Sequence, residues 1–520
     1  MPNFKHYDYN QDSMIVINFE EQLLPNTFEF TIHHLINNHI DLSTFNEHYN
    51  NDHGGRSAYN PAILLKIILF AYSKGITSSR EIQWQCRTNI IFKALSCDSV
   101  PHFTSIASFV SSYPKAIESV FEQILLVCDQ QGLLGNELFA IDGCKMSSDA
   151  SKEYSGTIKE LGQKRDKIRK KIHYCLKEHK KLDGRKPSDR DRKKRLGQEA
   201  KTLTKSFKKI EKFLASAEPR MGHAKKPKEV KSNITDNQSG KMTTSKGTIQ
   251  GFNGVAAVDK KHQIIVEAQA FGEGQEHHTL KPMIDGIKDH YRRAGISDDI
   301  IAEKVIVTAD TGFANEANNA YLKSSGINAY IPDNQFRSRD KKFDHQKIKY
   351  GKRHQDIVKG VKKVIPAKDF IFNHKAKTCI CPNDKALKLR NEICSDGKTK
   401  LLFEGRLKDC RNCPIKNLCM RSPESANHSN GNGRQVSVTF TNGKTPTDWM
   451  KRRVDSKKGK TIYSHRMSVV EPVFGNIGTN KGLNRFSLRG KEKVQGQWRL
   501  FCLVHNIEKL KNYGDISAVS

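Results

Sequence analysis

The first quarter of the chain carries apolar residues in a pattern that predicts short helices in series. Residues 62–72 are almost wholly apolar, begin after Pro61 and stop before Gly75, as expected for a buried helix. Ser78 and Glu81 form a capping-box pattern that starts a second helix, and residues 104–113 give a third. Such a series is typical of a helix-turn-helix bundle that binds DNA. An ordinary helical subdomain without a DNA role fits the same pattern.

Further along, short apolar segments predict the strands of a mixed sheet. The segment from Glu137 runs into Asp142 and Gly143, so Asp142 is expected at or near the end of a buried strand. A second apolar strand, residues 304–309, ends in the same way at Asp310. The remaining elements are expected as strands at 250–259, 263–268 and 328–332, with helices at 279–293 and around 320. This order, a hairpin followed by alternating helices and strands, fits a mixed α/β sheet.

Residues 158–231 differ sharply in composition from the segments on either side. Residues 159–231 contain 27 Lys and Arg against 10 Asp and Glu, a net charge of +17. Apolar residues recur at intervals of three and four from Ile158 to Leu182 and again from Leu196 to Leu214, which predicts two amphipathic helices forming an antiparallel coiled-coil hairpin. The basic flanks of the hairpin can follow phosphate backbones, although a charged hairpin exposed to solvent without a ligand has the same pattern.

Between residues 333 and 462 the regular apolar pattern gives way to polar, basic sequence with half of the cysteines, which indicates an inserted subdomain. Order returns with a helix at 464–477, which contains Glu471, and a last helix at 491–512. The chain is therefore predicted to be an α/β multidomain protein. Its parts are a helical N-terminal domain (1–132), a core (133–157, 232–332 and 463–520), a basic hairpin (158–231) and a Cys-rich insertion (333–462).

The composition points to a polyanionic partner. The formal net charge is +32 over 520 residues, which favours contact with nucleic acid. No apolar run reaches 18 residues, so no membrane-spanning helix is expected, and the N-terminus lacks the plan of a secretory signal. A cytoplasmic, nucleoid-associated location follows. Twelve cysteines are too few for a disulfide scaffold in a chain of this length.

Two acids, Asp142 and Asp310, each follow an apolar strand, and neighbouring strand ends can bring their side chains together. Like charges at that distance repel unless a cation lies between them, and Mg²⁺ prefers carboxylate and phosphate oxygens. From the residues alone, turn-capping aspartates remain the alternative. Glu471, on a predicted helix, is the third acid of this set.

Several motifs resemble the DDE transposases of bacterial insertion sequences, and most closely the insertion-sequence 1182 family. The resemblance covers nearly the whole chain. Its most specific block begins with Val470-Glu471-Pro472-Val473-Phe474-Gly475 and continues through Lys481, Arg485-Phe486 and Leu488-Arg489-Gly490. The segments Ala140-Ile141-Asp142-Gly143, Gly251-Phe252-Asn253 and Thr308-Ala309-Asp310-Thr311-Gly312 carry the rest.

The resemblance implies a ribonuclease H-like catalytic core in which Asp142, Asp310 and Glu471 bind two Mg²⁺ ions, with Mn²⁺ able to replace them. It also implies that Tyr463 and Arg466 contact backbone phosphate, and it places Arg485 on the same DNA surface. The family pattern is only partly kept, because four residues rather than three separate Arg466 from Glu471 and Gly478 stands where a lysine is expected. Lys481 is the residue that could replace it.

The cysteines predict a structural metal site. Cys410 and Cys413 form a C-x₂-C pair, Cys419 follows, and Cys381 lies upstream. Four thiolates satisfy tetrahedral Zn²⁺, which would help to fold an insertion with little apolar core of its own. Reduced thiols without a metal remain the alternative.

Taken together, the sequence predicts a DNA transposase. It would bind the terminal inverted repeats of its element and target DNA, cleave and join strands with Mg²⁺, and act at least as a homodimer because two ends must be exchanged. A decayed or repurposed sequence-specific DNA-binding protein without catalysis is the alternative, and a hydrolytic nuclease that never joins ends is a third candidate.

Overall fold

The computed structural model describes residues 16–49, 54, 57–183, 189–223, 227–245, 247–343, 364–373, 376–395, 398–441 and 445–515. The chain folds into two compact units. The first unit comprises residues 1–314, 324–331 and 461–520, and the second comprises residues 315–323 and 332–460.

The described part of the first unit begins with a bundle of six α-helices. The predicted helices are present as α2, α3 and α5, and α3 starts at Ser78, whose side chain accepts a hydrogen bond from the Glu81 amide. Three further helices, α1, α4 and α6, lie where no helix was predicted. The bounds are α1 Phe28–Asn38, α2 Pro61–Ser73, α3 Ser79–Thr88, α4 Ile90–Ser96, α5 Phe103–Ser112 and α6 Pro114–Gln130.

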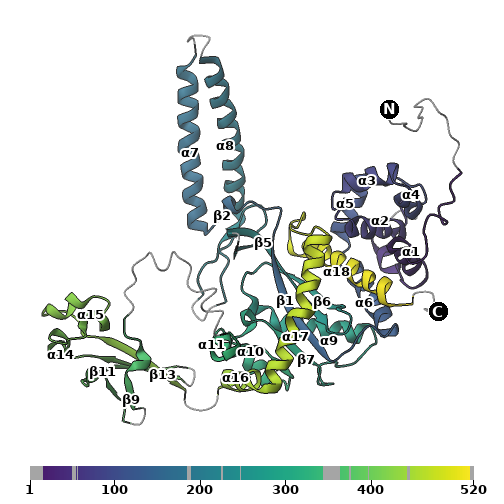
Figure 1. The fold of residues 1–520 in the computed structure, drawn as a ribbon. Helices are drawn as coiled ribbons and strands as arrows, with labels where there is room; N and C mark the ends of the chain where they lie inside the picture. The colour runs from purple at the N-terminus through teal and green to yellow at the C-terminus, as the bar shows by residue number, and fades with distance from the viewer. Residues whose placement is uncertain are drawn as a thin grey trace, which may run out of the picture. The chain divides into compact units, whose positions relative to one another are not determined.

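A six-stranded mixed sheet forms the centre of the first unit (Figure 1). Its main path runs β4-β5-β1-β7-β8, and β6 also pairs with β5. Strand β1 is antiparallel to β5 and parallel to β7, and β7 is parallel to β8. The bounds are β1 Leu138–Ser147, β4 Gly240–Thr244, β5 Gly247–Asp259, β6 Ile265–Phe271, β7 Ile306–Ala309 and β8 Ala329–Tyr330. The short strands β2 (Ser155–Gly156) and β3 (Ser232–Asn233) form a separate pair.

Asp142 was predicted at or near the end of a buried strand, and the continuously buried part of β1 does end at Ile141, but the strand itself continues past Asp142. Five further residues of β1 stay paired with β5, down to the pair Ser147 and Gly251. A glycine at 251 permits this close approach, because a Cβ at that position would overlap the carbonyl group of Met146. Only the pairing with β7 stops at residue 141. Asp142 therefore lies one residue past the pairing of β1 with β7 and within the pairing of β1 with β5.

The C-terminal helix α18 (Lys491–Tyr513) joins the helical bundle to the sheet. It contacts β6 on one side and α2, α5 and α6 on the other. Its apolar side chains are almost fully buried, and the indole nitrogen of Trp498 donates a hydrogen bond to the Val255 carbonyl at 3.1 Å. Phe501 stacks on Tyr72 with ring centroids 4.7 Å apart. Helix α9 (Leu280–Arg293) also contacts β5 and β6.

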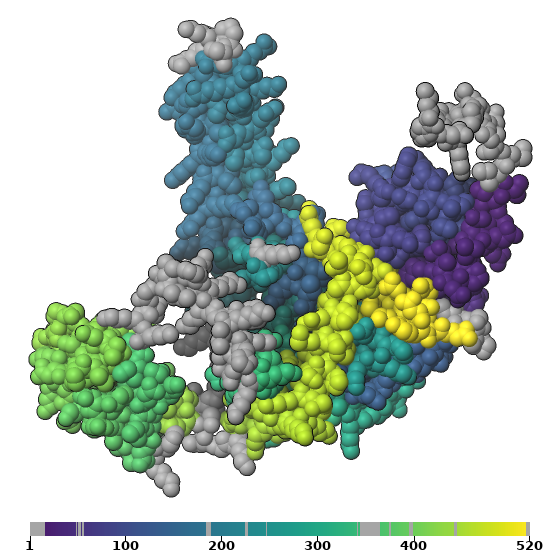
Figure 2. Space-filling model, viewed as in Figure 1, coloured from purple at the N-terminus to yellow at the C-terminus, as the bar shows by residue number. Residues whose placement is uncertain are grey.

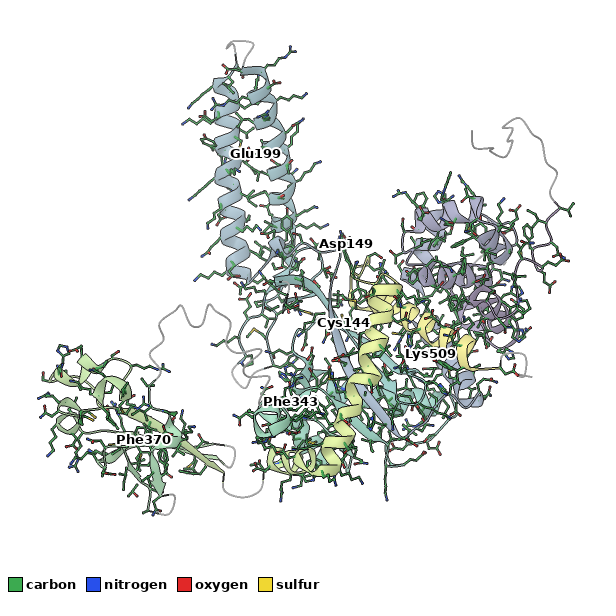
Figure 3. All side chains as sticks on the ribbon, viewed as in Figure 1. Cys144, Asp149, Glu199, Phe343, Phe370 and Lys509 are labelled. Atoms are coloured by element: carbon green, nitrogen blue, oxygen red, sulfur yellow. The ribbon has the colours of Figure 1, made fainter. Side chains whose placement is uncertain are left out.

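The basic segment forms two long helices, α7 (Ile158–Lys181) and α8 (Arg190–Ser216), that contact each other (Figures 1 and 2). A complete capping box between Thr157 and Glu160 starts α7. Glu199, labelled in Figure 3, pairs with Lys171 across the hairpin at 2.5 Å. The helical hairpin predicted from the apolar pattern is present. The turn predicted after Asp183 lies mostly at residues 184–188, outside the described residues.

The second unit contains a five-stranded antiparallel sheet of order β13-β12-β11-β10-β9. Its bounds are β9 Ile371–Asn373, β10 Thr378–Ile380, β11 Ala386–Ser395, β12 Lys398–Glu404 and β13 Gln435–Thr441. The short helices α14 (Leu407–Arg411) and α15 (Lys416–Cys419) follow β12, and α10 (Glu316–Ser324), α11 (Phe336–Arg339) and α16 (Pro446–Asp455) also belong to this part. Among the described helices, none is both long and apolar enough to cross a membrane.

Candidate functional site

Asp142 and Asp310 occupy corresponding positions on neighbouring strands of the central sheet, one residue past the last pair of β1 and β7. The last paired residues of β1 and β7 are Ile141 and Ala309, so the two acids are the next residue on each strand. The strands are parallel, so both side chains leave the same edge of the paired region on the same face. The two carboxylates interact electrostatically, and Asp310 is one of the causes that raise the pKa of Asp142.

The Asp142 carboxylate is held by neighbouring donors. Arg466 Nη2 lies 2.7 Å from Asp142 Oδ2, and the Gly143 amide donates to Asp142 Oδ1 at 2.9 Å. Burial is the largest influence on this carboxyl and raises its pKa, while the Arg466 charge opposes that change. Asp310 begins the short 3₁₀ helix Thr311–Phe313 and accepts a hydrogen bond from the Gly312 amide at 2.7 Å.

A third carboxylate, Glu276, lies beside these two acids and was not predicted. It belongs to the 3₁₀ turn Glu276–His278 after β6, and its carboxylate lies 3.3 Å from Lys145 Nζ. Burial raises the pKa of Glu276, and the charges of Asp310 and Asp142 raise it further. Glu276 lies five residues after the end of β6, in a turn whose sequence carries no apolar period that would have indicated its position.

Glu471 lies on α17 (Lys457–Gly475), and its side chain is exposed. Pro472 is inside this helix, so Glu471 is near the helix C-terminus rather than at its start. Arg466, which contacts Asp142, precedes Glu471 by five residues. At about 100° per residue, the two side chains point about 140° apart around the helix axis. The charge of Asp310 is among the causes that raise the pKa of Asp142 and of Glu276.

The four residues expected on DNA differ in their surroundings. Tyr463 is half-buried, and Arg466 is buried against Asp142 instead of facing solvent. Lys481 is also buried, and its Nζ lies 2.6 Å from Glu508. The Lys481 ammonium is thus engaged by Glu508, and its contact with phosphate stays a prediction. Arg485 is exposed and pairs with Asp149 at 2.8 Å.

Arg485 and Arg489 both contact Asp149, which is labelled in Figure 3. These residues line a cavity that also includes Lys152 and Lys209, the latter from α8. Basic side chains from the end of β1, from the hairpin and from the segment before α18 therefore meet at one hollow of the surface. Such a hollow suits a phosphate backbone.

The four predicted zinc ligands lie in one region of the second unit. The Cys410 thiol accepts a hydrogen bond from the Arg434 amide, and Cys381, Cys410 and Cys413 are near enough to influence the pKa of Cys419, which is raised mainly by burial. However, among the described residues no three of these sulfurs lie within 4.8 Å of one another. The structure thus does not support a formed zinc site.

Within the described part of the chain, one group of side chains meets that distance: Glu118, Glu122 and His290. His290 also lies 2.9 Å from Glu267, and Arg293 and Arg499 pair with the glutamates. Three carboxylates thus face three basic groups, so the charge is already balanced. This cluster links α6, α9, β6 and α18 as a buried ion network.

Two segments of the chain match protein-family models. Residues 380–511 match the model described as "Transposase DDE domain", and residues 17–112 match "Transposase domain (DUF772)". The first segment includes Glu471 and the second covers α1 to α5. No curated protein matches the chain. These two segments are therefore similar to a transposase DDE domain and to a transposase domain.

Proposed function

We propose that this transposase binds the terminal inverted repeats of an insertion sequence, cleaves DNA at the repeat ends and transfers the freed strand to target DNA. The observation that carries the proposal is that Asp142 on β1 and Asp310 after β7 occupy corresponding positions, one residue past the last pair of these strands. Two half-buried acids, of which Asp142 has a raised carboxyl pKa, form the kind of oxygen-rich site that suits a hard divalent cation. We assign the ribonuclease H-like core to the six-stranded sheet that holds them.

Asp142 and Asp310 would hold Mg²⁺, or Mn²⁺ in its place, and two ions are proposed. A bound pair of ions would activate the attacking oxygen and stabilise the leaving oxygen of a phosphodiester. Glu471 is the third ligand according to the family resemblance. The chain's own contribution is to fix the Asp142 carboxylate with Arg466 and Gly143, and the Asp310 carboxylate with the Gly312 amide.

DNA would be held by three basic surfaces of the first unit. The hairpin α7–α8 supplies exposed lysines along its length, and the cavity beside Asp149 supplies Arg485 and Arg489. On α3, Ile82 and Cys86 are buried, while Trp84 is 57% exposed between Arg80 and Arg87. An aromatic side chain between two arginines on an exposed helix face can bind nucleic acid by stacking and charge.

Because two element ends must be processed together, the active complex is proposed to contain at least two copies of the chain.

The test uses purified protein and labelled DNA that carries the repeat ends of the flanking element. Metal-dependent cleavage at those ends is expected with Mg²⁺, no cleavage with EDTA, and loss of cleavage in the Asp142→Asn and Asp310→Asn variants. Joined products should appear when target DNA is added. Cleavage that persists in either variant would contradict the assignment, and nicking without joining would indicate a nuclease.

One contact favours the alternative of a non-catalytic DNA-binding protein. Arg466 already occupies one oxygen of Asp142, and Gly478 stands at the position of the expected lysine. Such a protein would bind the repeat DNA tightly and leave it uncut in both Mg²⁺ and Mn²⁺. A related active transposase, run in parallel on its own ends, shows whether the conditions permit the chemistry.

A further inference from the structure

Glu276 is placed against the same short segment that holds Asp310. A Cβ built on Gly312 would overlap the Glu276 carboxylate and would lie 3.0 Å from Asp310 Oδ1. The absence of a side chain at 312 therefore lets the two acids lie on either side of one backbone position. Glu276 is only 14% exposed, so its carboxylate faces the protein and not bulk water.

The charges around these acids are not balanced. Asp142, Asp310 and Glu276 carry three negative charges when ionised, and their described basic neighbours are two, Arg466 and Lys145. Asp142 is 22% exposed, so two of the three carboxylates are largely removed from water. Grouping like charges in this way is unfavourable unless a cation joins them.

A second observation at the same place concerns the amide of Asn253. This residue of β5 is fully buried, and neither its Oδ1 nor its Nδ2 has a hydrogen-bond partner in the described structure. The amide lies over Gly143, since a Cβ on that glycine would be 2.8 Å from Asn253 Oδ1 and 2.9 Å from Nδ2. Gly143 directly follows Asp142, and Asn253 pairs with Lys145, the partner of Glu276. The unpaired amide thus lies on the face of β1 that carries Lys145, the partner of Glu276, and buried amides without partners are rare.

We propose that Glu276 is a metal-binding carboxylate of the Asp142–Asp310 site, which would then hold a divalent cation with three acids from three separate elements of the core. Carboxylate oxygens on β1, after β7 and after β6 would supply the ligands, and Lys145 would orient Glu276 for this role. This inference rests on the proposed function. It gives the site a carboxylate from within the folded core in addition to Glu471, whose side chain on α17 is exposed.

The ordinary explanation for Glu276 is an ion pair with Lys145 and nothing more. The two explanations differ in what Glu276→Gln does to metal affinity. The matched control is Glu273→Gln, three residues earlier in the same loop, where the carboxylate is 39% exposed and pairs with His223 at 2.9 Å. We would measure Mn²⁺ binding to the full-length chain, without DNA, by titration calorimetry.

For Glu276→Gln the Mn²⁺ dissociation constant is expected to rise by about tenfold or more, while Glu273→Gln stays within about twofold of the parent chain. An unchanged affinity in a folded Glu276→Gln variant would overturn the inference. If that variant does not fold, the parent chain still gives an answer. Fe²⁺ with ascorbate and peroxide should cut the backbone near residues 142, 276 and 310, and cuts near 142 and 310 alone would exclude Glu276.

DNA cleavage separates this inference from the proposed function. If Asp142→Asn abolishes metal-dependent cleavage and Glu276→Gln leaves it intact, only the role of Glu276 is wrong. If Asp142→Asn still cleaves, the proposed function itself fails, whatever Glu276 does.

Discussion

The guanidinium of Arg466 lies 2.7 Å from the carboxylate of Asp142, and both side chains are largely removed from solvent. This contact joins α17 to the central strand of the sheet. It connects the helix that carries the Glu471 motif to Asp142, the acid for which the family resemblance implies a catalytic role. Arg466 therefore positions Asp142 and partly neutralises it.

Replacing Arg466 should affect both stability and activity. Arg466→Ala removes the cation from the largely buried Asp142 carboxylate and leaves only the hydrogen bond from the Gly143 amide. The free energy of unfolding should therefore fall by about 2 kcal/mol. DNA cleavage should also fall, because Asp142 loses its fixed orientation. Urea denaturation and the end-cleavage assay measure the two effects. Met467→Ala changes the next residue of α17, which is 52% exposed, and should leave both nearly unchanged. Equal losses in the two variants would contradict a specific role for Arg466.

Lys481 should matter for folding and not for DNA affinity. Its Nζ lies 2.6 Å from Glu508 Oε1, and its side chain is 8% exposed. Lys481→Met would leave Glu508 without its cation, at an expected loss of about 3 kcal/mol in unfolding free energy. Affinity of the folded fraction for repeat DNA should remain within about twofold. Lys493→Met, at an exposed position of α18, serves as the control for stability. A large loss of affinity without loss of stability would restore the phosphate contact expected from the sequence.

The sequence predicted the proximity of Asp142 and Asp310 because each follows an apolar segment that must be a buried strand. The register then makes them neighbours. Glu276 was missed for the opposite reason. It lies in an irregular turn, where no period in the sequence reports which way a side chain points, and only tertiary contacts with Gly312 and Lys145 place it at the site.

The five-stranded sheet of the second unit was also missed, and its burial explains why. Only one face of its strands packs into a core, with Leu401, Phe403 and Val436 buried. The alternate positions are Lys, Leu and Glu in β12 and Gln, Ser and Thr in β13, so the apolar residues of Lys398–Glu404 form one short run between polar residues. Alternation of apolar and polar residues is a weak signal for a short strand when many of the polar positions are charged.

The basic hairpin should supply DNA affinity that depends strongly on salt. Lys201, Lys205 and Lys208 follow one another on exposed turns of α8. If each contacts one phosphate, the triple Gln variant should weaken DNA binding and reduce the slope of log K against log salt by about three. Fluorescence anisotropy with duplex DNA at several salt concentrations measures both. Lys171→Gln is the control, because Lys171 is paired with Glu199 across the hairpin. An unchanged slope in the triple variant would mean that α8 does not touch DNA.

Acid should destabilise the first unit through His505. This histidine is buried in α18, where its Nε2 donates to the Gln263 carbonyl at 2.9 Å and its Nδ1 accepts from Asn476 at 3.2 Å. Burial lowers its pKa to about 4, opposed in part by the hydrogen bond to Gln263. The folded state therefore holds the neutral ring, and the unfolded chain, with a pKa near its ordinary 6.5, binds the proton more readily.

This contribution to stability is complete above about pH 6.5 and is lost as the pH falls towards 4, by about 3 kcal/mol at most. His505→Gln removes the titrating group. The variant should start less stable than the parent at pH 7.5, because the ring packing is changed, but it should lose less unfolding free energy between pH 7.5 and 5. Urea denaturation at these two pH values measures the difference. His465→Gln, at an exposed position of α17, should keep the parent's pH dependence. A His505→Gln variant with the parent's full loss would show that another group controls the acid response.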